Sequence, residues 1–341
     1  MKKILLAVLS IAALASCAQD EILGVAKDDA IVFKNAFVDN ATKAIDPSIT
    51  NVGGANAISE FQVWGTTQGD HDGAVIVPIF ADEKVDNKAG EWMYSAGKTQ
   101  YWIDGNKYNF AAVVNGQVAL LEKGLPKTIE YTADGTTDLL YARSTNDILG
   151  KASGNEKVGF TFKHLLSKAG FTFVNTTPAP QSGKGVIYTV SDVKISGLSG
   201  TATYDVDNGW LNQNTTYTQE FGHIVAKDAD SKINTPAEIA EQGEGAANYE
   251  CLLIPGIYTT ATVTCTINLY LNGVVKEENL ADVIKYSHTI SRLSLKPGYM
   301  YNFALSTGLN EVIKFDVVEV EAWKPGMTPY PGTPDNDDPL N

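Results

Sequence analysis

The sequence contains few of the residues on which metal sites and disulfide scaffolds depend. Its 341 residues include three cysteines and four widely spaced histidines, and no HExxH or CxxC motif is present. The GxSxG, GxGxxG and P-loop motifs are also missing. These absences argue against the zinc, nucleotide-binding and hydrolase classes that the motifs define. We therefore expect no enzyme, cofactor or metal ion, although 40 acidic residues leave glycosidase-type carboxylate pairs open.

Positive charge and long hydrophobic runs are also scarce. Lys and Arg number 26 against 40 acidic residues, so the formal net charge is −14 and the pI is about 4.7. This balance argues against nucleic acid and against an anionic membrane surface as partners. After the first segment no stretch reaches 18 apolar residues, so no later membrane span is expected. A hydrophobic content of 44% excludes a largely disordered chain, and the length suggests two domains.

Residues 1–16 have the features of a bacterial lipoprotein signal peptide. Two lysines precede the apolar run 4–14, and "LASC" follows, with Ser16 and Cys17 at its end. This stretch resembles a lipobox, which predicts cleavage between Ser16 and Cys17 and acylation of the cysteine thiol, for example with palmitate. The alternative is an ordinary secretory signal with a small-residue cleavage site.

Acylation of Cys17 would leave residues 17–29 as a lipidated linker on a membrane-anchored protein. Asp20 and Glu21 follow the cysteine closely and resemble the export signal that sends lipoproteins of Bacteroidetes to the outer face of the cell. We therefore expect the protein at the outer membrane, on the cell surface. Loss of both leading lysines leaves 24 basic against 40 acidic residues, a mature charge of −16.

The mature sequence reads as β-strands nearly throughout. In "AIVFKNAFV" (30–38), period-two alternation places Ile31, Phe33 and Phe37 on one face, with Asn35 as the exception. Turn signals such as Asn208-Gly209 recur at hairpin spacing. Only short stretches such as "ENLADVIK" (278–285) suggest a turn or two of helix.

The strands form two series, separated by the weakly periodic stretch 144–157. This pattern predicts an all-β fold of two tandem antiparallel β-sandwich domains, over 30–150 and 151–323. Residues 324–341 are rich in Pro and Asp and should form an extended tail.

Two further features concern the interior. Cys251 and Cys265 are interpreted as small buried residues, although a cross-strand disulfide in an oxidising compartment stays open. The heptad "GNKYNFA" (105–111) returns as "GYMYNFA" (298–304), with a turn glycine leading into a strand in both copies. We interpret this repeat as a sign of two copies of one domain type.

Several segments together resemble the fimbrillin family of Bacteroidales, whose members build type V pili. The segments are "IVFKNAFVDNATKA", "FTFKHLLSKAGFTF", "LLIPG", "LKPGYMYNF" and "FDVVEVEAW", and they follow in the family's order behind the lipobox. The resemblance covers essentially the whole mature chain. It implies two transthyretin-like β-sandwich domains, export as a lipoprotein, and assembly with other pilin subunits by strand exchange.

The resemblance to the fimbrillins implies that a protease cuts after the basic residue of a Thr-Arg-Ala element and so removes the first strand. This sequence has Thr42-Lys43-Ala44, so a trypsin-like protease would have to cut between Lys43 and Ala44. Residues 30–38 would be the removable strand, with Ile31, Phe33 and Phe37 as its inward side chains. Their burial would contribute about 5–8 kcal/mol.

The donor segment stays open. The tail after Trp323 contains five prolines, which cannot donate to a β-ladder, so a tip, adhesive or anchor subunit is an alternative to a stalk subunit. A receptor on a host or bacterial surface would be a further partner of an adhesive subunit.

The alternative function is a surface glycan-binding lipoprotein of a nutrient-uptake system. Such a module would need exposed aromatic rings for stacking against sugars. Trp64, Trp92, Trp102 and Trp210 are the candidates, although tryptophans more often pack in cores.

Overall fold

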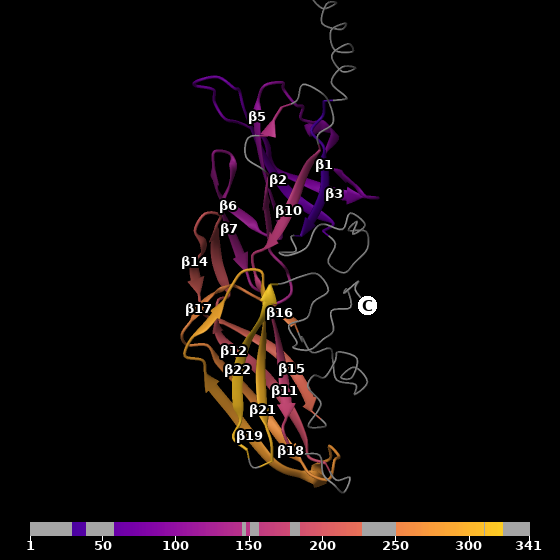
Figure 1. Cartoon of the computed structure of the whole chain (residues 1–341), viewed down its shortest axis with the longest axis vertical. Coiled ribbons are helices and arrows are strands. Elements are labelled where there is room, and N and C mark those ends of the chain that lie inside the picture. The colour runs from indigo at the N-terminus through magenta and orange to yellow at the C-terminus, as the bar shows by residue number, and fades with distance from the viewer. Residues whose placement is uncertain are drawn as a thin grey trace, which may run out of the picture.

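The structure is a computed structural model of the whole chain. It describes residues 29–38, 58–144, 148–150, 157–177, 185–226, 250–309 and 311–322. The predictions about the signal peptide, acylation of Cys17 after Ser16, cleavage between Lys43 and Ala44, and the tail lie outside the described residues. Figure 1 shows an elongated molecule with strands gathered in an upper and a lower half.

The upper half is built around a closed ring of strands. In spatial order the ring contains β2 (Glu60–Gln68), β3 (Val77–Lys88), β4 (Glu91–Met93), β1 (Phe33–Val38), β10 (Val158–His164), β8 (Leu140–Arg143) and β5 (Lys107–Val114). Of these strands, β1, β2, β3, β5 and β10 are labelled in Figure 1. β5 pairs with β2 and closes the ring, and β9 (Ile148–Leu149) pairs with the start of β5. The β1–β10 pair is parallel, and the other pairs are antiparallel. Closure leaves no free sheet edge within the ring.

A second sheet connects the two halves. Its strands are β6 (Gln117–Glu122), β7 (Leu125–Thr132), β13 (Thr201–Asp205) and β14 (Gly209–Asn214), in the order β14-β13-β7-β6. The turn "DVDNG" joins β13 to β14, as the sequence predicts for a hairpin. Lys127 Nζ lies 3.1 Å from Asp205 Oδ1 and 2.5 Å from Asp207 Oδ2, which ties the hairpin to β7. Strand pairing therefore crosses the predicted boundary at residue 150, because β10 pairs with β8 and β13 with β7.

The lower half is a sandwich of two four-stranded sheets. One has the order β16 (Glu250–Leu253), β11 (Ser167–Asn175), β21 (Tyr299–Thr307) and β22 (Lys314–Ala322). The other has the order β15 (Tyr217–Ala226), β12 (Ile187–Leu198), β18 (Thr262–Tyr270) and β19 (Leu280–Thr289). β17 (Gly256–Tyr258) pairs with β20 (Leu293–Leu295). Side chains from both sheets form one buried cluster that includes Phe171, Val190 and Phe303.

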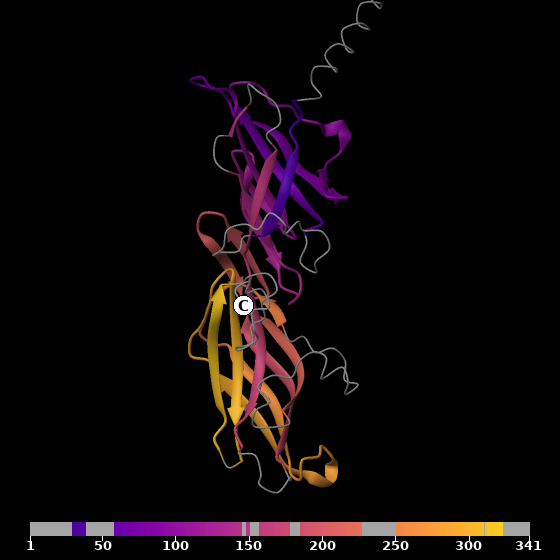
Figure 2. The ribbon, with the colours of Figure 1, turned by 45° about the vertical axis from the view of Figure 1, so that its right-hand side comes forward.

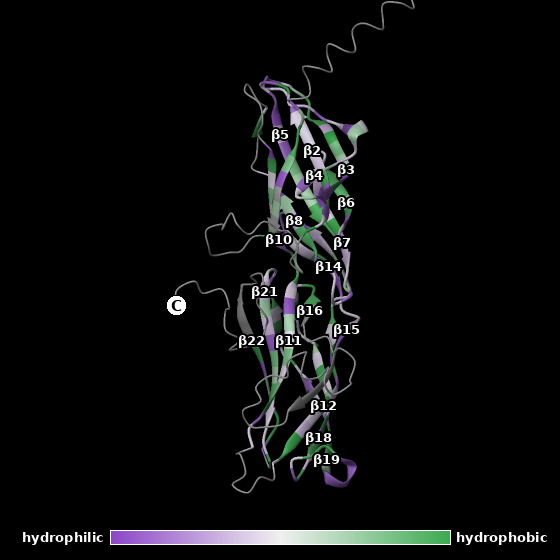
Figure 3. Cartoon of the chain, turned by 90° about the vertical axis from the view of Figure 1, so that its right-hand side faces the viewer, coloured by the Kyte–Doolittle hydropathy of each residue, from purple (hydrophilic) through white to green (hydrophobic). Residues whose placement is uncertain are grey.

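The prediction of an all-β fold with several antiparallel sheets is confirmed. The transthyretin-like arrangement of the two domains stays a prediction. Short 3₁₀ turns, η1 (Ala96–Lys98) and η2 (Glu277–Asn279), interrupt the strands. Of the turn or two of helix expected at residues 278–285, only the 3₁₀ turn η2 overlaps the start, and from Leu280 onward the prediction is wrong because the chain enters β19. Figure 3 shows hydrophobic and hydrophilic residues interleaved along the strands of both halves, as expected for sheets with one buried face.

The repeated heptad has the same local structure in both halves. Gly105 and Gly298 have positive φ angles of 77° and 71°, which favour glycine. Three residues later, Tyr108 and Tyr301 are buried, and each phenol oxygen accepts a backbone N–H from five residues upstream: from Ile103 (2.6 Å) and from Lys296 (2.9 Å). The sheet neighbours differ, because β5 has antiparallel neighbours whereas β21 is parallel to β11. What the chain repeats is therefore a local element, a glycine turn followed by a buried tyrosine that binds the backbone, and not the arrangement of the surrounding strands.

Candidate functional site

The candidate site is the first strand together with the slot that it fills. β1 lies between β4 and β10, and Figure 2 shows it (indigo) alongside β10 (magenta). It pairs with β10 in parallel from Phe33–Val158 to Val38–Phe162, and with β4 at the single pair Phe33–Trp92. The Val158 N–H donates to the Val32 carbonyl oxygen at 2.8 Å. β1 thus joins β10, which comes after the other ring strands in the sequence, to the β2–β3–β4 part of the ring.

A bulge changes which residues of β1 face the core. Lys34 is paired with Gly159 and Ala36 with Phe160, so two steps on β1 correspond to one on β10, and Asn35 is the extra residue. Ala36 is 2% exposed, although strict alternation from Ile31 and Phe33 would place it outward. The bulge explains why Asn35 breaks the sequence pattern.

Phe33 lies at the centre of the upper core. It is 3% exposed, and its ring is within about 6 Å, centroid to centroid, of five others: Phe61 (6.0 Å), Phe80 (5.6 Å), Tyr94 (5.8 Å), Phe110 (6.3 Å) and Phe160 (5.9 Å). These partners come from β2, β5, β10 and from β3 and the residue after β4. Ile31 is fully buried in the same cluster. Loss of β1 would therefore leave an apolar pocket at the middle of the ring.

The pocket depends on a glycine in the neighbouring strand. A Cβ atom on Gly65 of β2 would lie 2.8 Å from Phe110 Cδ1 and 2.9 Å from Phe80 Cδ2. Both rings contact Phe33. The absence of a side chain at Gly65 therefore leaves the space in which the rings of Phe80 and Phe110 pack against Phe33.

The residues before β1 are held by a second segment. We call residues 94–102, which follow β4 and include η1, the latch segment. Ile31 N–H donates to the Gln100 carbonyl (2.8 Å), Trp102 N–H donates to the Asp29 carbonyl (2.9 Å), and Ala30 forms an antiparallel bridge with Tyr101. The Tyr94 hydroxyl also donates to the Ile31 carbonyl at 2.8 Å. The first strand is consequently held by β10 along its length and by the latch segment at its start.

The structure brings together some of the predicted site residues. Ile31 and Phe33 both point into the upper core, as the alternation predicts. The backbone of Phe37 pairs with Thr161, and its side chain lies outside the described residues, as do Ser16, Cys17, Lys43 and Ala44. Sequence reasoning missed Ala36, because the bulge is a feature of the pairing with β10. It also missed Tyr94, because its contact with Ile31 spans 63 residues.

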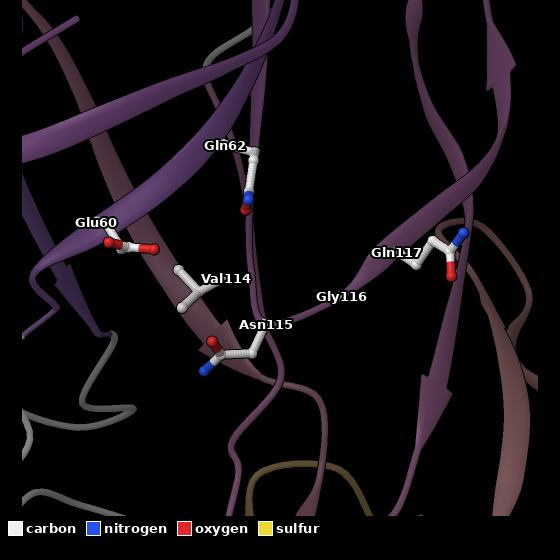
Figure 4. Close-up of a pocket in the computed structure, with 6 residues that line it drawn as sticks. All are labelled: Glu60, Gln62, Val114, Asn115, Gly116 and Gln117. Atoms are coloured by element: carbon white, nitrogen blue, oxygen red, sulfur yellow. The ribbon is translucent and has the colours of Figure 1, made fainter.

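Two surface hollows in the described part of the chain are lined mainly by polar side chains. One, of about 210 Å³, is lined by residues at the start of β2 and around the turn from β5 to β6: Glu60, Gln62, Val114, Asn115, Gly116 and Gln117. Figure 4 shows the side chains of Glu60 and Gln117 on opposite sides of this hollow. A second, of about 270 Å³, includes Glu130, Asp134 and Thr137 among its lining residues. In the second hollow the Thr137 hydroxyl donates to Asp134 Oδ2 at 2.5 Å.

Other candidate groups serve the packing. His164 Nδ1 lies 2.5 Å from Asp138 Oδ2 at the end of β10.

Within the described ranges, no three His, Cys, Asp or Glu side chains group so that they could hold a metal ion. None of the helices in the same ranges has the length and apolar character that a membrane crossing requires. Cys251 and Cys265 are buried in the lower core, and neither forms a disulfide within the described residues.

Three of the four tryptophans proposed for sugar stacking are buried, and Trp210 is half-buried. Trp64, Trp92 and Trp102 are 5%, 7% and 8% exposed, and Trp210 packs against a buried cluster while its Nε1 donates to the Leu165 carbonyl at 2.8 Å. These four rings therefore form no exposed platform.

Comparison with known proteins agrees with this all-β architecture. The chain belongs to the fimbrillin-like family, whose model matches residues 42–323. A fimbrial protein from Bacteroides vulgatus has a similar solved structure, with 14% identity, a TM-score of 0.57, and coverage of 87% of this chain and 100% of the other. A protein from Bacteroides ovatus assigned to cell adhesion has 17% identity, a TM-score of 0.50, and coverage of 88% and 98%. At these identities the likeness shows the fold alone. A search of curated proteins finds no match.

Proposed function

We propose that this protein is a structural, non-enzymatic subunit of a cell-surface type V pilus. The chain would be exported as a lipoprotein, acylated on Cys17 after cleavage at Ser16, and displayed at the outer membrane. Family membership supports the role of a pilus subunit, and the likeness to fimbrial structures supports its fold. Its partners would be other pilin subunits, a processing protease and, in an adhesive subunit, a surface receptor.

The observation that carries the proposal is the position of β1 in the ring. A strand that lies between β4 and β10 leaves two sets of unpaired backbone groups when it is removed. Removal of Phe33 and Ile31 also exposes the aromatic pocket to water. A strand from a neighbouring subunit would restore the backbone hydrogen bonds and, with alternate apolar side chains, fill the pocket.

Release of β1 requires a cut between β1 and β2, and Lys43–Ala44 lies in that interval. A trypsin-like protease would accept Lys43, whereas an Arg-specific protease would not. The Pro-rich segment after Trp323 is a poor donor along most of its length. The position in the pilus therefore has two alternatives: a stalk subunit, or a tip, adhesive or anchor subunit. The segment that donates the incoming strand is left open.

Mild trypsin treatment of a chain that starts at Ala18 tests this proposal. We expect a new N-terminus at Ala44, loss of residues 18–43 and filaments in electron micrographs. The matched control is Lys43→Gln, which removes the cleavage site without touching β1 and should stay monomeric. A cut chain that loses β1 and remains monomeric would contradict strand exchange. Retention on insoluble polysaccharide without polymers would favour the glycan-binding alternative.

A further inference from the structure

Glu83 on β3 is an unusual residue for a closed ring, because it is a carboxylate that is only 3% exposed. Buried carboxylates are costly unless they are paired and hydrogen-bonded. The partners of Glu83 both belong to the latch segment. Lys98 Nζ lies 2.5 Å from Oε2, and the Ser95 N–H donates to Oε1 at 3.3 Å.

These contacts connect a buried charge to the start of the first strand. η1 carries Lys98 and is closed by a bond from the Lys98 N–H to the Ser95 carbonyl at 2.9 Å. Two residues beyond Lys98, the Gln100 carbonyl accepts the N–H of Ile31. Movement of η1 away from β3 would therefore also move the groups that bind residues 29–31.

The other end of the latch segment is held by apolar packing. Trp102 is 8% exposed, and its ring lies 4.6 Å from that of Tyr108 and 6.0 Å from that of Phe110. Tyr94, at the opposite end, packs against Phe33 and Phe80. Between these two anchored rings, the Glu83 contacts hold the exposed turn 95–98 in place. Lys98 itself has a side chain that is 63% exposed, so the pair can be altered from solvent.

We propose that Glu83 and Lys98 are positioning residues that keep the latch segment closed over residues 29–31 and so set the rate at which a cleaved β1 leaves the ring. This inference rests on the proposed function, because it concerns the release step of strand exchange. An open latch frees the start of β1 first, and the parallel pairing with β10 then separates from Phe33 onward.

Burial alone would raise the pKa of Glu83, but hydrogen bonds from Lys98 and Ser95 outweigh it and lower the pKa below its ordinary value. The ionisable groups that interact with the carboxylate are Lys98 and Tyr94, both on the latch segment. The folded pKa is depressed, so the contribution of the pair is present above the ordinary carboxyl pKa and is lost as the pH falls through the folded pKa.

The experiment uses a chain that starts at Ala18 and carries a specific protease sequence between β1 and β2. After cutting, the β1 fragment is held without a covalent link, and its loss is followed by size exclusion and mass spectrometry. We expect Lys98→Met to release the fragment about ten-fold faster than the unmodified chain, because it breaks the pair of a buried carboxylate. Lys98→Arg should restore slow release. The matched control is Lys84→Met. Lys84 lies next to Glu83 on β3, and its exposed ion pairs with Glu60 of β2 and with Asp86 are lost in this variant, which should not change the rate.

Hydrogen exchange in the uncut chain gives a second readout that does not depend on strand exchange. In Lys98→Met and Glu83→Gln, the amides of Ile31 and Trp102 should exchange faster, while that of Val158 should keep its protection. Acid should speed release of the cut β1 fragment from the unmodified chain. It should not change the release rate of the Glu83→Gln variant.

Equal release rates in all variants, with unchanged exchange at Ile31 and Trp102, would overturn the latch while leaving strand exchange intact. A fragment that never leaves any variant would overturn the proposed function and the latch together.

Discussion

At the scale of the residue, single aromatic side chains explain much of the fold. Phe33 contacts four rings from different strands and the Tyr94 ring of the latch segment, and burial of a ring of this size contributes about 1.5–3 kcal/mol. Tyr108 and Tyr301 combine an apolar ring in the core with a hydroxyl that satisfies a backbone N–H at the entrance to a strand. The same residue type thus supplies packing and hydrogen bonding in both halves.

Tyr108→Phe and Tyr301→Phe each remove one hydroxyl from this repeated element. The N–H of Ile103 or Lys296 then loses its acceptor, so we expect the free energy of unfolding to fall by about 1–3 kcal/mol in each variant. Urea denaturation measures the change. Tyr101→Phe is the control, because its ring is 38% exposed. A loss no larger than that of the control would show that the repeat is only a similarity of sequence.

The buried thiols give a second prediction at this scale. Burial raises the pKa of Cys265 to about 12, so its thiol is protonated in the folded protein at pH 8. A raised folded pKa gives stability that is complete below the ordinary thiol pKa and is lost as the pH rises toward 12. In a chain that starts at Ala18, alkylation of Cys265 at pH 8 should be slow until denaturant unfolds the lower half. Rapid labelling of the native protein would contradict this account.

At the scale of the element, β1 differs from the other ring strands in how it is held. It pairs in parallel with β10 on one side and has only one residue pair with β4 on the other. β2, in contrast, is paired along most of its length with both β3 and β5. The first strand therefore combines a large buried apolar contribution with comparatively few backbone pairs on one side.

Gly65→Ala tests how tightly the slot for β1 is packed. The added methyl would overlap Phe110 and Phe80, so both rings must shift, and we expect a loss of about 1–3 kcal/mol in the free energy of unfolding. Gly159→Ala, in β10 of the same ring, is the matched control, because the nearest atoms to its Cβ lie 3.8 Å away. Chemical denaturation compares the two. Equal effects would mean that the aromatic cluster can rearrange freely.

At the scale of the whole molecule, the two halves share a hydrophobic core. This cluster contains Trp64 and Val113 from the ring and Leu252 and Ile254 from the lower half. It also contains Leu165, which lies between β10 and β11. The β13–β7 pairing and the Lys127–Asp205 ion pair lie beside it. A shared core and a shared sheet make a bend between the halves costly, which suits a subunit in a filament.

We expect the chain from Ala18 to unfold in one thermal transition, because neither half can expose this cluster without the other. Calorimetric and van't Hoff enthalpies should agree. Leu252→Ala, which leaves a cavity in the shared cluster, should lower the free energy of unfolding by about 2–5 kcal/mol and shift the whole transition. Two separate transitions in the unmodified chain would contradict the coupling.

Much of the strand content could be predicted from the sequence. Alternation identified residues 30–38 and the inward positions of Ile31 and Phe33, and Asn208-Gly209 indicated the turn of the β13–β14 hairpin. The bulge at Asn35 and the contact of Tyr94 with Ile31 could not be predicted, because each depends on a segment far away in the chain. "ENLADVIK" has helical spacing, yet pairing with β18 makes most of it a strand.

Local patterns in the amino-acid sequence are enough to predict a β protein, because alternation and turn residues act over a few neighbouring positions. Which strands meet depends on the folded chain: β1 lies parallel to β10, β13 joins β7, and Glu83 pairs with Lys98. The physical reason is that period-two alternation specifies which face of a strand is buried and leaves its neighbours undetermined. Those neighbours are chosen by packing and hydrogen bonding over the whole chain.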